Sequence, residues 1–119
     1  MSTLGFKQVK GVALAVTDAA RARGFYVETL GLAPVLENGE ETGVRLGGAL
    51  LMFKSDWYGL PTDAPNPRIT IETDDARATE AALRERGVTI PDPVAQYGSS
   101  FIGSFLDSEG NKLWFCSVA

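Results

Sequence analysis

The chain has 119 residues, of which 45% are hydrophobic and 22% charged, and its formal net charge at pH 7 is −4. This length supports one compact domain and is too short for two ordinary ones. The acidic balance, without any basic cluster, argues against nucleic acid as a partner.

The first half of the chain predicts one strand, one helix and three further strands. Residues 9–17 form a continuous apolar run of strand length. Asp18 is a typical helix N-cap, and apolar residues recur behind it at helical spacing as far as Gly31, a favoured terminator. Gly24, inside this helix, is expected to allow close packing. Short strands follow near residues 33–37, 42–46 and 49–54.

The second half repeats this order after a proline-rich connector, residues 55–67. A strand is expected over residues 68–73, and Asp74 or Asp75 then caps a second helix that ends at Gly87. The remaining strands are expected near residues 94–97, 101–106 and 112–117, with the turn Asp107–Asn111 between the last two.

The two halves form an internal repeat. Asp18 and Asp75 lie 57 positions apart, and so do Gly11 and Arg68. We therefore expect an α+β fold in which two βαβββ modules share one domain, because each helix covers only one face of its own sheet. The expected boundaries are residues 1–119 for the domain, about 7–54 for module one, 55–67 for the connector and about 68–119 for module two.

Cellular location is predicted from three features. The longest apolar runs have the length of strands, so no segment is expected to span a membrane. The N-terminal residues lack the apolar core of a secretory signal. Cys116 is the only cysteine, which excludes an intrachain disulfide and is typical of a reducing cytoplasm. The protein is therefore expected to be cytoplasmic.

Three segments together resemble one known family. They are GVALAVTDAARARGFYVETLGL, RITIETDDARATEAALRERG and GSSFIGSFLDSEGNKLWF. The chain resembles the glyoxalase, bleomycin-resistance and ring-cleaving dioxygenase superfamily, also called vicinal oxygen chelate proteins. The resemblance implies paired βαβββ modules whose curled mixed sheet surrounds a cavity, and a homodimer.

Enzymes of that superfamily hold a divalent metal through four strand residues, mostly His and Glu. The resemblance places these positions at Gly11, Met52, Arg68 and Trp114. Glycine and tryptophan are not metal ligands, arginine is a permanent cation, and a lone thioether is too soft for Mg, Mn or Zn. No metal and no cofactor are therefore expected, and the metal-dependent enzyme is disfavoured.

Strand alternation predicts which residues share the cavity side with these four positions. Opposite residues, such as Val12, Leu14 and Ile71, are apolar and are expected to face the helices. The cavity side is mixed, with small, aromatic and charged side chains, which suits a flat organic ligand. The residues assigned to it are Gly11, Ala13, Ala15, Thr17, Met52, Arg68, Thr70, Glu72, Lys112, Trp114 and Cys116.

The favoured hypothesis is a protein that binds and sequesters an antibiotic-like small molecule, aromatic or cationic, as metal-free drug-resistance members of the superfamily do. Two aromatics in the connector and two near the terminal strands add to the cavity side chains, and Glu72 is a candidate partner for a ligand cation. The predicted ligand-binding set is Trp57, Tyr58, Trp114, Met52, Phe101, Arg68, Glu72 and Tyr97.

Other interpretations stay open. Trp114 can instead be a plug, Arg68 and Glu72 a structural ion pair, and Trp57 and Tyr58 anchors of the connector. A metal-independent lyase or isomerase would use Glu72 as general base and Arg68 to stabilise an oxyanion. A structural or regulatory dimer is the third alternative.

Overall fold

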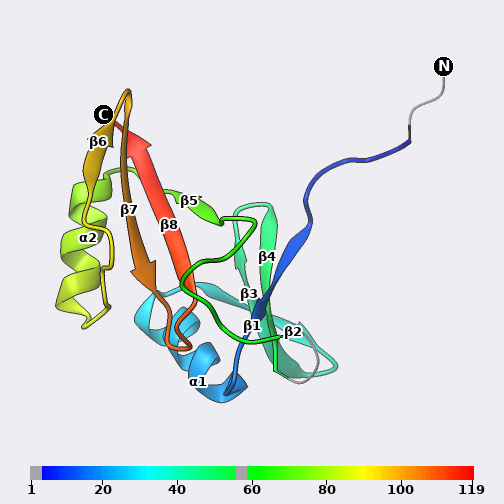
Figure 1. Ribbon diagram of the computed structural model, residues 1–119. Coiled ribbons are helices and arrows are strands. Elements are labelled where there is room, and N and C mark those ends of the chain that lie inside the picture. The colour runs from blue at the N-terminus through cyan, green and yellow to red at the C-terminus, as the bar shows by residue number, and fades with distance from the viewer. Residues whose placement is uncertain (1–3, 56–58) are drawn as a thin grey trace.

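Each half of the chain builds its own four-stranded sheet (Figure 1). The computed structural model describes residues 4–55 and 59–119. None of the helices in these residues is long and apolar enough to cross a membrane. The elements are β1 (Gly11–Ala15), α1 (Ala19–Arg23), the π-helical segment η1 (Gly24–Thr29), β2 (Ala33–Glu37), β3 (Glu40–Leu46), β4 (Ala49–Lys54), β5 (Thr70–Glu72), α2 (Ala76–Glu85), β6 (Ala95–Tyr97), β7 (Ser100–Leu106) and β8 (Lys112–Val118).

The two sheets have the same topology, which confirms the predicted α+β fold of two βαβββ units. Their strand orders are β1-β4-β3-β2 and β5-β8-β7-β6, with one parallel pair in each, β1 with β4 and β5 with β8. The strand register also repeats. Ala13 lies opposite Met52 in the first sheet, and Thr70 lies opposite Trp114 in the second.

Both helices begin at an aspartate. The Asp18 carboxylate accepts a hydrogen bond from the Arg21 N–H (3.0 Å), and Asp75, rather than Asp74, accepts one from the Ala78 N–H (3.1 Å). The second part of the first helix is wider than predicted. The Leu30 N–H reaches the carbonyl of Phe25 five residues earlier (2.9 Å), so η1 is a π-helical segment.

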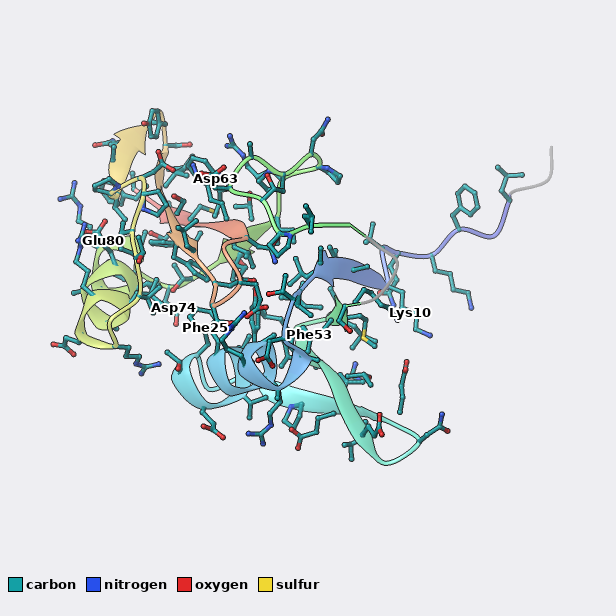
Figure 2. The ribbon with its side chains drawn as sticks, turned by 60° about the horizontal axis from the view of Figure 1, so that its bottom comes forward. Lys10, Phe25, Phe53, Asp63, Asp74 and Glu80 are labelled. Atoms are coloured by element: carbon teal, nitrogen blue, oxygen red, sulfur yellow. The ribbon has the colours of Figure 1, made fainter. Side chains whose placement is uncertain are left out.

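One apolar core lies on the helix side of both sheets. Phe25 and Phe53 lie beside α1 at the centre of the molecule (Figure 2). Tyr26 is fully buried, and its ring centroid is 5.4 Å from that of Phe53. Phe25 lies 6.4 Å from Phe105 of β7, between ring centroids, so the core continues from the first half into the second.

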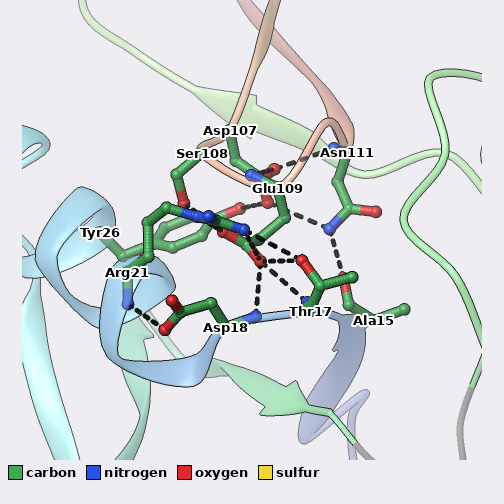
Figure 3. Close-up of polar contacts among 9 residues, drawn as sticks. All are labelled: Ala15, Thr17, Asp18, Arg21, Tyr26, Asp107, Ser108, Glu109 and Asn111. Atoms are coloured by element: carbon green, nitrogen blue, oxygen red, sulfur yellow. Dashed lines mark hydrogen bonds and ion pairs between the residues drawn. The ribbon is translucent and has the colours of Figure 1, made fainter.

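A polar junction also joins the two halves (Figure 3). The Tyr26 hydroxyl donates to the buried carboxylate of Asp107 (2.7 Å). Burial, followed by the charge of Asp107, raises the pKa of Tyr26 well above its ordinary value, so the hydroxyl keeps its proton. The Asn111 side-chain amide donates to the Ala15 carbonyl at the end of β1 (2.7 Å). The turn predicted over residues 107–111 is therefore a tertiary contact between the modules.

Glu109, in the same turn, binds the start of α1. Its carboxylate accepts hydrogen bonds from the N–H groups of Thr17 (2.8 Å) and Asp18 (2.9 Å) and forms an ion pair with Arg21 (2.8 Å). Burial of the carboxyl favours its neutral form, but the hydrogen bonds from Arg21, Asp18 and Thr17 outweigh burial and lower the pKa of Glu109 to about 2.

Two glycines give opposite stability predictions. The expected close packing at Gly24 is wrong, because a Cβ there would have no heavy atom within 4 Å, and its backbone is right-handed helical. Gly24→Ala should therefore stabilise the protein by up to ~1 kcal/mol. A Cβ on Gly43 would lie 2.3 Å from the Leu51 carbonyl oxygen, so Gly43→Ala should destabilise it by about 1–3 kcal/mol. Urea unfolding measures both, and equal effects would contradict the prediction.

The Glu109 contacts predict a specific pH dependence. Because its pKa is lower in the folded protein than the ordinary 4.5, the stabilisation is fully present above about pH 4.5 and is lost as the pH falls towards 2. Glu109→Gln should lower the free energy of unfolding at pH 7 and flatten its decline between pH 4.5 and 2. Glu37→Gln, at an exposed position of β2, is the control. Parallel pH profiles for the wild type and Glu109→Gln would refute this role.

Candidate functional site

The candidate site lies on the open face of the second sheet, the face turned away from α2. Strand register places Thr70 of β5, Trp114 of β8 and Ser104 of β7 in one row across this face. Glu72, Cys116 and Ile102 form the next row. Thr70, Glu72, Trp114 and Cys116 therefore share one face, as the strand alternation predicted.

Two cations lie over the half-buried ring of Trp114. The guanidinium carbon of Arg68 lies 4.0 Å from the centroid of the indole ring, and the Lys112 ammonium lies 5.1 Å from it. Both distances are within the range of cation–π attraction. Arg68 comes just before β5, where the Trp114 N–H donates to the Ile69 carbonyl (2.9 Å) and so holds the backbone next to it.

Asp92 completes this cluster from the segment before β6. Its carboxylate forms an ion pair with Lys112 (2.8 Å) and accepts a hydrogen bond from the buried Ser104 hydroxyl (2.6 Å). The Lys112 ammonium and then the Ser104 hydroxyl lower the pKa of Asp92 below its ordinary value of 3.8. We call Arg68, Asp92, Lys112 and Trp114 the indole cluster.

Arg68 and Glu72 do not form the ion pair that the sequence suggested as an alternative. Arg68 lies on the indole ring instead, and Glu72 is exposed. Within residues 4–55 and 59–119, neither side chain has a partner of opposite charge at ion-pair distance. The two charges are therefore separate features of the open face.

The small residues of β1 line a different space. Gly11, Ala13 and Ala15 border a cavity of about 400 Å³ along the free edge of this strand. The opposite wall comes from the connector and the segment before β5, and Asn111 lies at the end of β1. The connector residues in this wall are Leu60, Thr62, Pro65, Asn66 and Pro67.

A second cavity of about 350 Å³ lies on the helix side, between the two modules. Leu30 and Leu46 border it from the first module, and Leu83 and Phe115 from the second. Glu72 also borders it, at the end of β5. Neither of the two cavities includes Trp114, Arg68 or Met52 in its walls, so the predicted cavity residues are divided among three places.

The remaining predicted ligand contacts are scattered. Trp57 and Tyr58 fall outside the described residues. Tyr97 is 64% exposed at the end of β6. Phe101 lies on the helix side of β7, where the Arg77 guanidinium carbon of α2 is 4.6 Å from its ring centroid. Met52 is in the first sheet, and its sulfur borders the space where a Cβ on Gly43 would lie.

Two members of the indole cluster, Lys112 and Asp92, were not predicted as site residues from the sequence. Lys112 was assigned to the correct face but not to the site, although its position two residues before Trp114 is a usable signal. Asp92 carried no signal, because it lies outside any predicted strand and reaches Lys112 only through the tertiary fold.

The residues at the four positions that the resemblance predicts for metal ligands do not fit a divalent cation. The residues are glycine, a thioether, a guanidinium and an indole, and the Lys112 ammonium adds a second positive charge beside Trp114. In the part of the chain that the structure describes, no three His, Cys, Asp or Glu side chains are grouped as a metal site would require.

Comparisons with known proteins agree with this fold. The sequence profile of the Glyoxalase/Bleomycin resistance protein/Dioxygenase superfamily matches residues 8–115. No curated protein is similar enough to count as a match.

Among solved structures, one similar to the chain is TnmS3, an antibiotic binding protein from Streptomyces sp. CB03234 (TM-score 0.80, 23% identity, 98% of this chain and 100% of that chain). Another is a putative glyoxalase family protein from Bacillus anthracis (TM-score 0.81, 16% identity, 99% of this chain and 100% of that chain). A superfamily member from Sphaerobacter thermophilus is also similar (TM-score 0.78, 24% identity, 96% of this chain and 99% of that chain). At these identities the likeness establishes the fold alone.

The indole cluster predicts a change in one carboxyl pKa. Lys112→Met removes the ion pair with Asp92, so the pKa of Asp92 should rise. Titration of the Asp92 side-chain carbon by NMR measures this. Lys54→Met, a lysine of β4 in the other sheet, should leave that pKa unchanged. An unaltered Asp92 pKa in Lys112→Met would show that the ion pair is absent in solution.

Proposed function

The chain belongs to the Glyoxalase/Bleomycin resistance protein/Dioxygenase superfamily, and we propose that it is a metal-independent member that binds and sequesters an aromatic small molecule. The observation that carries this proposal is the indole cluster. At the position where the resemblance predicts a metal carboxylate, this chain has Trp114, a half-buried ring of the kind that supports stacking of a flat ligand.

The open face supports binding rather than bond chemistry. An aromatic plane and hydrogen-bonding groups beside it are components of a small-molecule site. The alternative enzyme would need Glu72 in a site that excludes water, whereas Glu72 is exposed and is not paired with Arg68. A binder of this kind acts by lowering the concentration of free ligand.

The antibiotic-binding neighbour supports the ligand class. TnmS3 has the same fold over nearly the whole of both chains. We therefore propose an antibiotic-like aromatic ligand for this chain as well. Trp57, Tyr58 and Tyr97 remain predicted contacts of that ligand. A cytoplasmic location remains a prediction that rests on the sequence features given above, including the lone Cys116.

The proposal includes a homodimer. The N-terminal segment before β1 extends away from the body of the molecule (Figure 1). It carries three large apolar side chains that are exposed to solvent. Leu4, Phe6 and Val9 are 83%, 91% and 75% exposed. Exposed apolar groups at this density support a contact with another molecule, and a second copy of the chain completes the arrangement expected for the superfamily.

The test is binding by EDTA-treated protein. A panel of aromatic antibiotics is screened by thermal shift, and compounds that raise the melting temperature are titrated with tryptophan fluorescence as the signal. We expect saturable quenching without added metal, and we expect Trp114→Phe to weaken the tightest complex by about tenfold. Native mass spectrometry then reports the dimer, the bound compound and its unchanged mass.

Two results would contradict the proposal. Consumption of a bound compound would identify an enzyme, and loss of that turnover in Glu72→Gln with binding retained would place the base there. Tight binding of one Mn²⁺, Ni²⁺ or Zn²⁺ per chain would show that the metal positions were wrongly assigned. The Trp57→Phe variant assigns the fluorescence change to one indole, because Trp57 and Trp114 are the only tryptophans and the variant reports Trp114 alone.

A further inference from the structure

The charge of the indole cluster bears on what kind of ligand the open face accepts. Arg68 and Lys112 carry two positive charges and Asp92 one negative charge, so the cluster is net positive by one. The chain as a whole is acidic, with a net charge of −4. Because the protein as a whole is acidic, an anion is attracted to this positive cluster rather than to the chain in general.

The contacts of Arg68 leave its hydrogen-bond donors available. Its guanidinium carbon is 4.0 Å from the Trp114 centroid, which is van der Waals contact with the ring. No hydrogen bond from the Arg68 side chain is formed within residues 4–55 and 59–119, so its N–H groups have no acceptor there. A guanidinium held against a ring binds a planar oxyanion with little further loss of side-chain entropy.

Lys112 and Asp92 have a different part in the cluster. The ion pair with Asp92 fixes the ammonium group 5.1 Å from the ring centroid, and Ser104 fixes Asp92 in turn. Lys112 is therefore paired with Asp92, whereas Arg68, whose charge also acts on Asp92, has no ion-pair partner of its own among the described residues. The ligand group that this arrangement recognises is one that approaches Arg68 from solvent along the indole ring.

Glu72 does not cancel this field. It is four residues from Arg68 along an extended segment, which corresponds to roughly 13 Å of backbone. That exceeds the Debye length of about 8 Å at physiological ionic strength. The open face therefore has a cationic end at the indole cluster and an acidic residue farther along β5. A ligand cation near Trp114 would meet Arg68 and Lys112 before it reached Glu72.

We propose that the indole cluster binds the anionic group of a planar aromatic ligand, a carboxylate or an ionised phenol, with Arg68 as the residue that selects it. This inference rests on the proposed binding function and specifies its ligand class. It replaces the cationic ligand considered from the sequence, because the side chains over Trp114 are cations. Arg68 forms the charged contact, and Trp114 supplies the plane beside which the ligand ring packs.

Three probes that share one ring system and differ in charge test this proposal. They are naphthalene-2-carboxylate, its neutral carboxamide and 2-naphthylmethylammonium, titrated calorimetrically into EDTA-treated full-length protein. The carboxylate should bind about tenfold more tightly than the carboxamide, and the ammonium most weakly. Raising the NaCl concentration from about 0.05 to 0.5 M should weaken binding of the carboxylate and leave that of the carboxamide unchanged.

Arg68→Met should reduce the carboxylate affinity about tenfold, to that of the carboxamide, and leave the carboxamide affinity within about twofold. Arg77→Met is the matched control, because Arg77 also lies over an aromatic ring, Phe101, but on the helix side of the sheet. It should change neither affinity. If Arg68→Met lowers the melting temperature strongly, the salt dependence of the wild-type protein decides the question instead.

The outcomes separate this proposal from the binding function. Equal affinities for all three probes, or a preference for the ammonium, would overturn the anionic ligand class and leave the binding function standing. An unchanged carboxylate preference in Arg68→Met would reject Arg68 as the selecting residue. Lack of binding by all three probes and by the antibiotic panel would contradict both proposals.

Discussion

The hydrogen bond between the Tyr26 hydroxyl and the buried Asp107 carboxylate is the contact on which the arrangement of the two modules depends. Asp107 also accepts hydrogen bonds from the N–H groups of Glu109 and Asn111 at 2.8 Å each, so the same carboxylate fixes the turn. A buried carboxylate that lost these partners would be strongly destabilising. Asn111 in turn holds the end of β1 and lies next to Lys112, the first residue of β8. The turn that joins the modules therefore also sets the position of the indole cluster.

Sequence patterns predicted the fold well because its signals are local. Apolar alternation, the Asp18 and Asp75 caps and the repeat spacing each reflect short-range geometry, and the element order follows from them. The turn Asp107–Asn111 was predicted only as a turn, since its partners lie about 90 residues away in the chain. The π-helical segment was missed, because its apolar spacing resembles that of an α-helix.

The site was harder to predict for the same reason. Asp92 becomes part of it only through contacts with Lys112 and Ser104. Phe101 was predicted as a ligand contact, but the hairpin register pairs Ser104 with Trp114 and so turns Phe101 to the opposite face. That register follows from the short turn between β7 and β8, so the sequence contained the information. Trp57 and Tyr58 lie outside the described residues.

The open face reverses the charge pattern of a metal site. A divalent metal is held by anionic and neutral donors around a cation, whereas here two cations lie over an aromatic ring. This reversal is the basis of the proposal that the site recognises an anion rather than a metal cation. NMR titration of the ¹⁵N-labelled, EDTA-treated protein with naphthalene-2-carboxylate tests this most directly. Saturable shifts are expected at the Trp114 indole N–H and the Arg68 side chain. Shifts confined to the cavity along β1 or to the cavity between the modules would contradict this proposal.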